Sequence, residues 1–167
     1  MRVTQPLRDE HKELIPHIET LRTVADSVGQ ASIESLRQGV EDVFEFLMHH
    51  LIPHAEAEDR ALYPVVGKVM GAPDATATMS RDHVEVGRLT DELASLRSEL
   101  SRAMLGEAQA KALRRVLYGL YALVKLHFAK EEEVYLPLLD ARLSAGAARD
   151  MFEAMENAAK QAKSRHG

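Results

Sequence analysis

Apolar residues recur at alternating steps of three and four along almost the whole chain, which is the spacing of one helix face. The stripes cover residues 7–28, 36–65, 79–100 and 113–138. Between them lie Gly29, the Gly71–Asp74 stretch and Gly106, which signal the end of a helix or a loop. Because no segment alternates with the period of two that strands require, the pattern predicts an all-α protein.

The order of these stripes predicts how the helices are arranged. Four long amphipathic helices with short connections favour an antiparallel up-down-up-down four-helix bundle, since sequential helices then lie side by side. We expect a single domain over residues 1–167, with its bundle at about 5–141. An Ala-rich amphipathic stretch predicts a short additional C-terminal helix at about 147–163, against an end or side of the bundle or at an interface.

Several of the helical stripes contain prolines, namely Pro16, Pro53, Pro64 and Pro137. Proline lacks the backbone N–H donor and crowds the preceding turn, so the sequence predicts kinks or breaks at these positions. Pro64 and Pro137 are expected near the ends of the second and fourth helices.

The composition excludes several classes of function. Lys and Arg total 21 against 26 Asp and Glu, and the net charge of −5 argues against binding to nucleic-acid phosphates. The absence of Cys excludes disulfides, thiolate metal ligands and thiol catalysis. No apolar run approaches the roughly 18 residues of a membrane span, and Met1–Leu14 lacks the apolar core of a signal peptide. We therefore expect a cytoplasmic protein without a membrane or nucleic-acid partner.

The chain contains an internal repeat. Each half has a lone histidine, then a His-x3-Glu pair, then a proline ten residues after the histidine of that pair. These residues are His11, His54, Glu58 and Pro64 in the first half and His83, His127, Glu131 and Pro137 in the second. The shared register of three residue types predicts two similar helix–loop–helix halves.

The histidines and glutamates of this repeat interrupt the apolar stripes, where ionisable groups need a partner. An unpartnered buried carboxylate costs several kcal/mol, and a domain of this size has only about 5–15 kcal/mol of stability. Residues at i and i+4 share a helix face, so each His-x3-Glu pair can direct an imidazole and a carboxylate to one point. Four imidazoles and two carboxylates suit two iron or manganese ions, or zinc, bridged by the carboxylates. The alternative is a metal-free bundle in which these groups pair with one another.

Residues near these motifs carry separate expectations. His50 lies one turn before the first His-x3-Glu pair and is expected either to serve as an additional ligand or to support a ligand from behind. Asp59 and Glu132 are interpreted as solvated charges, with Glu132 the candidate for a contact to a ligand. Tyr63 is expected to pack near a helix end rather than take part in redox chemistry, and His166 to lie in a disordered tail.

The ordered set of motifs resembles the hemerythrin-like (HHE cation-binding) family over residues 7–140. The resemblance implies a non-haem di-iron centre bridged by two carboxylates and a solvent-derived oxygen, with the ligands His11, His54, Glu58, His83, His127 and Glu131. Oxygen-carrying members have a fifth histidine one turn along the third helix, where this chain has Gly87. The ferritin-like alternative is disfavoured, because it uses Glu-x-x-His pairs.

The missing histidine leaves a metal position open to a small molecule. The resemblance therefore implies a protein that binds or reacts with dioxygen, peroxide or nitric oxide, rather than a reversible oxygen carrier, and leaves open whether it is an enzyme. The alternative function is a non-enzymatic sensor of iron or oxygen, or an iron-binding module. The expected partner is a small-molecule ligand, and the expected state is a monomer or weak homodimer.

Overall fold

The first loop of the chain forms where two local signals meet. Helix α1 (Gln5–Ser27) ends just before Gly29, whose φ of 80° lies in the left-handed region that residues with a Cβ rarely adopt. Ser32 then begins α2 (Ile33–Phe46) by accepting a hydrogen bond from the backbone N–H of Ser35 at 3.2 Å. The end of α1 agrees with the sequence prediction, in which Gly29 marks the end of a helix.

The computed structural model describes residues 2–166, and within that range it contains helices and no strand. We use the word rod for each long helical segment of the bundle, including any π turns within it, and α1 is the first rod. The second rod is continuous and consists of α2, η1 (Leu47–Leu51), α3 (Ile52–Ala57), η2 (Glu58–Leu62) and α4 (Tyr63–Met70). The third rod is α5 (Ala77–Arg102). The fourth consists of α6 (Glu107–Lys130), η3 (Glu131–Tyr135) and α7 (Leu136–Arg142), and it is followed by α8 (Ala145–His166). The segments η1, η2 and η3 are single π turns.

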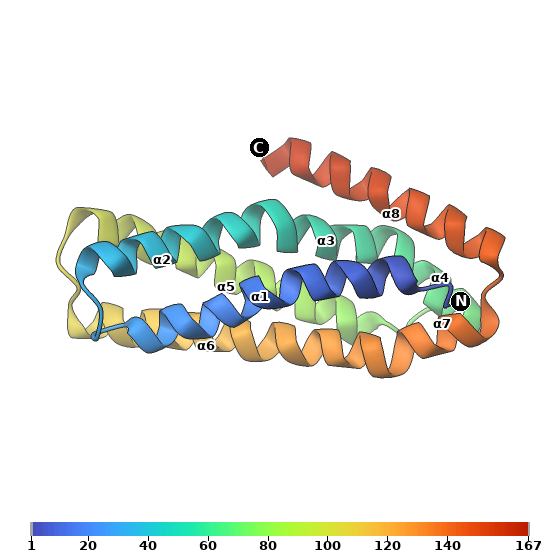
Figure 1. The fold of residues 1–167 in the computed structure, drawn as a ribbon, viewed down its shortest axis with the longest axis horizontal. Helices are drawn as coiled ribbons and strands as arrows, with labels where there is room; N and C mark the ends of the chain where they lie inside the picture. The colour runs from blue at the N-terminus through green and yellow to red at the C-terminus, as the bar shows by residue number, and fades with distance from the viewer. Residues whose placement is uncertain (1, 167) are drawn as a thin grey trace.

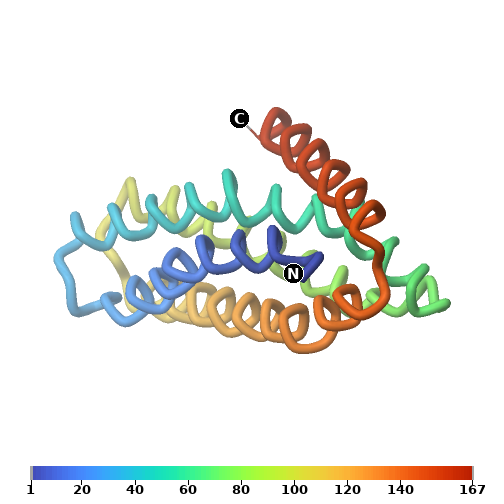
Figure 2. Tube along the Cα trace, turned by 45° about the vertical axis from the view of Figure 1, so that its right-hand side comes forward, coloured from blue at the N-terminus to red at the C-terminus, as the bar shows by residue number. Residues whose placement is uncertain are grey.

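These rods form the antiparallel four-helix bundle that the sequence predicts (Figure 1). Helices α1 and α5 each pack against both α2 and α6, so every rod has two neighbours. Helix α8 lies outside the bundle along α3 and η2, at an angle to the bundle axis (Figure 2). It therefore covers a side of the bundle rather than an end. No helix among residues 2–166 is both long enough and apolar enough to cross a membrane.

The prolines are accommodated without ending the helices, which corrects the expected breaks. Pro16 lies inside α1, and Pro53, Pro64 and Pro137 each stand two positions after a π turn. The residue before each of these three prolines donates its N–H to the carbonyl five positions back instead of four. The wider turn allows the helix to continue past a residue that has no N–H to donate.

Two apolar clusters fill the bundle, one on each side of a polar layer. The larger cluster includes Leu14, Leu51, Val86 and Phe128. The smaller cluster includes Leu7, Leu62, Met79 and Leu136. On each rod the buried histidines and glutamates lie between a residue of one cluster and a residue of the other. The polar layer is therefore separated from water along the bundle axis in both directions.

Candidate metal centre

The six residues predicted as metal ligands converge in this polar layer. All four rods contribute: α1, α3 with the start of η2, α5, and α6 with the start of η3. The residues are His11, His54, Glu58, His83, His127 and Glu131. Five of them are buried, and His83 is the most exposed, with 9 % of its side chain accessible. The bundle thus brings together donors from positions spread over most of the chain.

One group of donors, which we name the first half-site, consists of His11 and His54 with one oxygen of each glutamate. His54 Nε2 lies 2.8 Å from Glu58 Oε1, and His11 Nε2 lies 3.3 Å from Glu131 Oε2. One ligand atom from each of these four residues lies within 4.8 Å of the other three. Metal–ligand bonds of about 2.0–2.3 Å can span a group of this size.

The second half-site consists of His83 and His127 with the other oxygen of each glutamate. His83 Nε2 lies 3.1 Å from Glu58 Oε2, and His127 Nε2 lies 3.2 Å from Glu131 Oε1. Glu58 Oε2 is also 3.6 Å from His127 Nε2. Both carboxylates therefore divide their two oxygens between the two imidazole pairs, which is the arrangement that a carboxylate bridge between two ions requires.

The chemistry of this donor set fits a metal. Four buried atoms of the first half-site have no hydrogen-bond partner among the described residues: His11 Nε2, His54 Nε2, Glu58 Oε1 and Glu131 Oε2. The short contact between His54 and Glu58 does not have the geometry of a hydrogen bond. A buried polar atom left unsatisfied costs about 1–3 kcal/mol, and one cation satisfies all four. Imidazole nitrogen combined with carboxylate oxygen suits iron, manganese or zinc.

A carboxylate holds each imidazole of the cluster from behind. The distances from Nδ1 to the carboxylate oxygen are 2.7 to 3.0 Å in the pairs His11–Glu132, His54–Glu10, His83–Asp59 and His127–Asp82. A carboxylate can only accept, so each Nδ1 carries a proton, and Nε2 is the nitrogen that faces the cluster and can bind a metal. We name Glu10, Asp59, Asp82 and Glu132 the outer carboxylates.

The outer carboxylates follow the internal repeat. Glu10 and Asp82 directly precede the lone histidine of each half, and Asp59 and Glu132 directly follow the glutamate of each His-x3-Glu pair. Glu132 makes the contact expected of it, whereas the interpretation of Asp59 as only a solvated charge is wrong, because it accepts from His83. The recurrence of an acid beside each motif is the signal that could have identified all four.

Tyr63 reaches into the second half-site, which corrects the expectation that it only packs near a helix end. Its hydroxyl donates to Glu131 Oε1 at 2.7 Å and lies 3.0 Å from His127 Nε2 and 3.4 Å from His83 Nε2. Burial, followed by the negative charges of the two glutamates, raises the pKa of Tyr63 far above its usual value, so the hydroxyl keeps its proton. The equivalent position in the other half is Leu136, and this break in the repeat is the signal that marks Tyr63.

The structure does not bring His50 into the cluster, either as a ligand or behind one. Its side chain is exposed, and its ring stacks with those of Phe46 and His17, with 6.4 and 6.5 Å between ring centroids. His50 lies within η1, and the extra residue of a π turn rotates the preceding positions by about 100° relative to an uninterrupted α-helix. The expected disordered tail is also corrected, since His166 is helical and lies 2.9 Å from Glu56.

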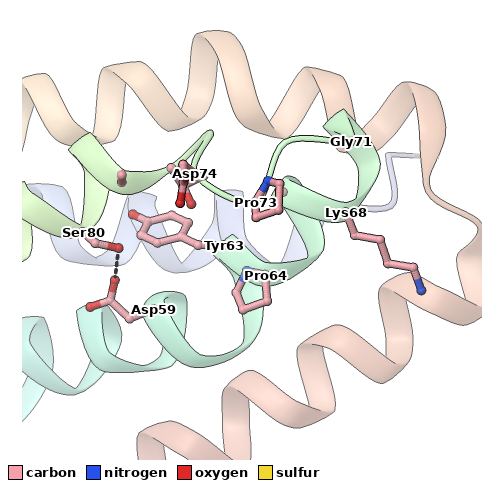
Figure 3. Close-up of a pocket in the computed structure, with 11 residues that line it drawn as sticks. Asp59, Tyr63, Pro64, Lys68, Gly71, Pro73, Asp74 and Ser80 are labelled. Atoms are coloured by element: carbon pink, nitrogen blue, oxygen red, sulfur yellow. Dashed lines mark hydrogen bonds between the residues drawn. The ribbon is translucent and has the colours of Figure 1, made fainter.

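A surface pocket of about 720 Å³ lies beside two residues that contact the second half-site (Figure 3). Asp59 and Tyr63 form part of its wall, and Ser80 donates a hydrogen bond to Asp59 at 2.7 Å. Both wall residues contact His83, the most exposed histidine of the cluster. A small molecule in the pocket would therefore be separated from the second half-site by the side chains of Asp59 and Tyr63.

The glutamates change the proton affinity of the histidines. Burial alone would lower the pKa of His11, but its contacts with Glu131 and Glu58 outweigh burial and raise that pKa to about 9. The same balance raises the pKa of His127 to about 10. One histidine of each half-site therefore carries an extra proton at neutral pH when no metal competes for its nitrogen.

Metal uptake at pH 7 is consequently expected to release at least two protons per chain, because both nitrogens must lose a proton before they can bind. Ordinary histidines, with a pKa near 6.5, would be mostly neutral at this pH and would release fewer. Calorimetric titration of the metal-free protein in buffers of different ionisation enthalpy measures the number. The release should decline toward zero above a pH of about 10. Release of less than one proton per chain at pH 7 would contradict the raised pKa values.

Comparison with known proteins gave one result. A family model described as the hemerythrin HHE cation binding domain matches residues 2–139. Neither a curated protein nor a solved structure gave a significant match. The matched region contains all six clustered residues and the four outer carboxylates, and it ends before α8. The family and the buried cluster together indicate metal binding, and the chain belongs to the hemerythrin HHE cation-binding family.

Proposed function

We propose that the protein holds two iron ions, one in each half-site, and binds or reacts with small oxidants such as dioxygen, peroxide or nitric oxide. The four histidines and two glutamates of the half-sites would be the ligands, and the glutamates the bridges. The observation that carries the proposal is that each carboxylate faces one imidazole pair with one oxygen and the other pair with the second. We take the whole chain as one domain, because α8 packs along α3 and η2.

When bound, iron would supply redox chemistry and coordination positions that a small molecule can occupy. The chain itself orients the four imidazoles through the outer carboxylates and excludes water with its two apolar clusters. Gly87 has no side chain that could add a ligand from α5. A centre with six protein ligands for two ions leaves room for a reactant, which supports reaction over reversible oxygen carriage.

Tyr63 is the residue through which the chain would act on a reactant. It lies on the wall of the pocket and beside both Glu131 and His127. Its raised pKa holds the proton at Oη, so a molecule that arrives from the pocket meets a hydrogen-bond donor. A hydrogen-bond donor fixed at this place would stabilise negative charge that develops on an oxygen of the reactant.

Protein expressed with iron provides the test. We expect two irons per chain by elemental analysis, and a change in the visible spectrum when peroxide or nitric oxide is added, or dioxygen to the reduced protein. Zinc-loaded protein is the control, because zinc has no redox chemistry and should give no change. An iron-loaded protein whose spectrum responds to none of the three would contradict the proposed reactivity, and protein that takes up no iron would contradict the metal centre.

The Tyr63→Phe variant is expected to keep both ions, because all six ligand residues remain, and to consume peroxide about 100-fold more slowly, the low end for loss of one hydrogen-bond donor to developing negative charge. The phenyl ring preserves the packing, so the free energy of unfolding should fall by only about 1 kcal/mol. Tyr135→Phe is the matched control, since the Tyr135 hydroxyl donates to the carbonyl of Ala75, outside the cluster. Equal peroxide rates in the two variants would count against a role for Tyr63.

A further inference from the structure

A second cavity, of about 440 Å³, opens at the surface between α1 and α6. It shares no lining residue with the pocket beside Tyr63. Its volume falls within the range of about 300–1,000 Å³ that is typical of small-molecule sites. The cavity has no part in the proposed metal chemistry, although His11 lines the inner wall of the cavity.

The floor of the cavity is apolar. Ile15, Ile18, Phe128 and Ala129 line it. The side chain of Ile15 is 43 % exposed, although it lines a cavity together with other apolar residues. Exposed apolar surface in a concave site is typical of a binding site. The ring of Phe128 is stacked on His11 at 4.2 Å between centroids, so this part of the floor is fixed in place. An unbranched hydrocarbon body would remove this surface from water.

The rim of the cavity is strongly cationic. Arg2, Arg8, Lys12 and Lys125 line it, and Glu132 is the one carboxylate among the lining residues. Lys12 and Lys125 pair with Asp9 at 3.6 Å and Glu19 at 2.8 Å, and Arg8 pairs with Glu132 and Asp140. The ion pairs of Lys12 and Lys125 are exposed and contribute little, so they do not prevent these two cations from attracting an anion. Arg8 is largely buried, and its guanidinium is already held by Glu132, Asp140 and Thr4, so the two exposed lysines are the cations available to a ligand.

We propose that this cavity binds the ionised form of a monocarboxylic acid with an unbranched apolar chain. The carboxylate would lie at the rim beside Lys12 and Lys125, and the chain would cover Ile15 and Phe128. Charge complementarity selects this ligand class over an alkylammonium or an alcohol of the same length, and the apolar floor selects it over an inorganic anion. Binding does not depend on the proposed iron chemistry, since it can be measured whatever ion the protein holds.

Calorimetric titration of the full-length, metal-loaded protein with octanoate tests the proposal. We expect saturable binding of one octanoate per chain, at least about tenfold tighter than binding of 1-octanol, octylammonium or inorganic phosphate. Octanol that binds as tightly as octanoate would overturn the proposal, because the cationic rim would then have no effect. Phosphate that binds as tightly would overturn it as well, because the apolar floor would have none. Absence of saturable octanoate binding at millimolar concentration would also overturn it.

Two variants locate the site. Ile15→Glu places a carboxylate on the apolar floor and should weaken octanoate binding at least about tenfold, and Lys12→Glu should weaken it about threefold. The matched controls are Val84→Glu, which changes a 63 % exposed apolar residue on α5, and Lys111→Glu, whose side chain is 72 % exposed, as is that of Lys12. Both controls should bind octanoate within about twofold of the unaltered protein. Loss of affinity in the controls, or unchanged affinity in Ile15→Glu, would place octanoate elsewhere and overturn the assignment.

Discussion

The Glu58→Gln variant is expected to lose both metal ions. Glu58 faces both half-sites, because Oε1 lies toward His11 and His54 and Oε2 lies toward His83 and His127. Glutamine has nearly the same volume, but it removes the negative charge and replaces one oxygen with an amide nitrogen that does not bind metals. We expect metal affinity to fall by more than about 100-fold, beyond the range observed when only a supporting residue is changed.

Glu56→Gln is the matched control for Glu58→Gln. Glu56 lies on the same rod, two residues earlier, but its carboxylate binds Arg165 and His166 of α8 and lies outside the cluster. Elemental analysis should find two ions per chain in this variant and almost none in Glu58→Gln. Because an ion that binds only the folded state stabilises it, added metal should raise the melting temperature of the control and not that of Glu58→Gln. Two ions per chain in Glu58→Gln would refute the shared-carboxylate arrangement.

The sequence predicts the fold and the clustered residues because both depend on helical periodicity. A buried stripe with a period of 3.6 specifies which face of a helix enters the core, and the repeat shows that the same polar interruptions occur in two halves. The glycines mark the loops because a left-handed φ at Gly29 and Gly71 disfavours any other residue. These signals are local, so they can be recognised without knowing how the helices pack.

The remaining features depend on contacts between helices. The repeat marks Asp59 and Tyr63 as unusual positions, but their contacts with His83 form only because α5 packs against the second rod. His50 is a residue that the sequence places in the cluster and the structure does not. An uninterrupted α-helix would put His50 on the same face as His54, but the π turn η1, which contains His50, rotates it away from that face. A π turn does not follow the 3.6-residue period, so a prediction that assumes this period cannot locate it.

Each half-site has two outer carboxylates of its own, so the metal affinity of one half-site can be lowered without changing the other. Glu10 and Glu132 support the histidines of the first half-site, and Asp59 and Asp82 support those of the second. The double variant Glu10→Gln/Glu132→Gln should therefore lose the ion of the first half-site, and Asp59→Asn/Asp82→Asn the ion of the second. Loss of one such partner costs about 10–100-fold in affinity, so loss of two should empty one half-site at limiting metal.

Dialysis against limiting metal, followed by elemental analysis, should find one ion per chain in each double variant and two in the unaltered protein. The remaining ion is retained because Glu58 and Glu131 still offer it one oxygen each. The control Asp42→Asn/Glu153→Gln changes the same residue types at exposed positions outside the cluster and should keep two ions. Loss of both ions in either double variant would mean that the half-sites bind only as a unit. Two ions per chain in both double variants would mean that the outer carboxylates do not affect the metal affinity of the histidines, although each outer carboxylate accepts a hydrogen bond from the Nδ1 of one histidine.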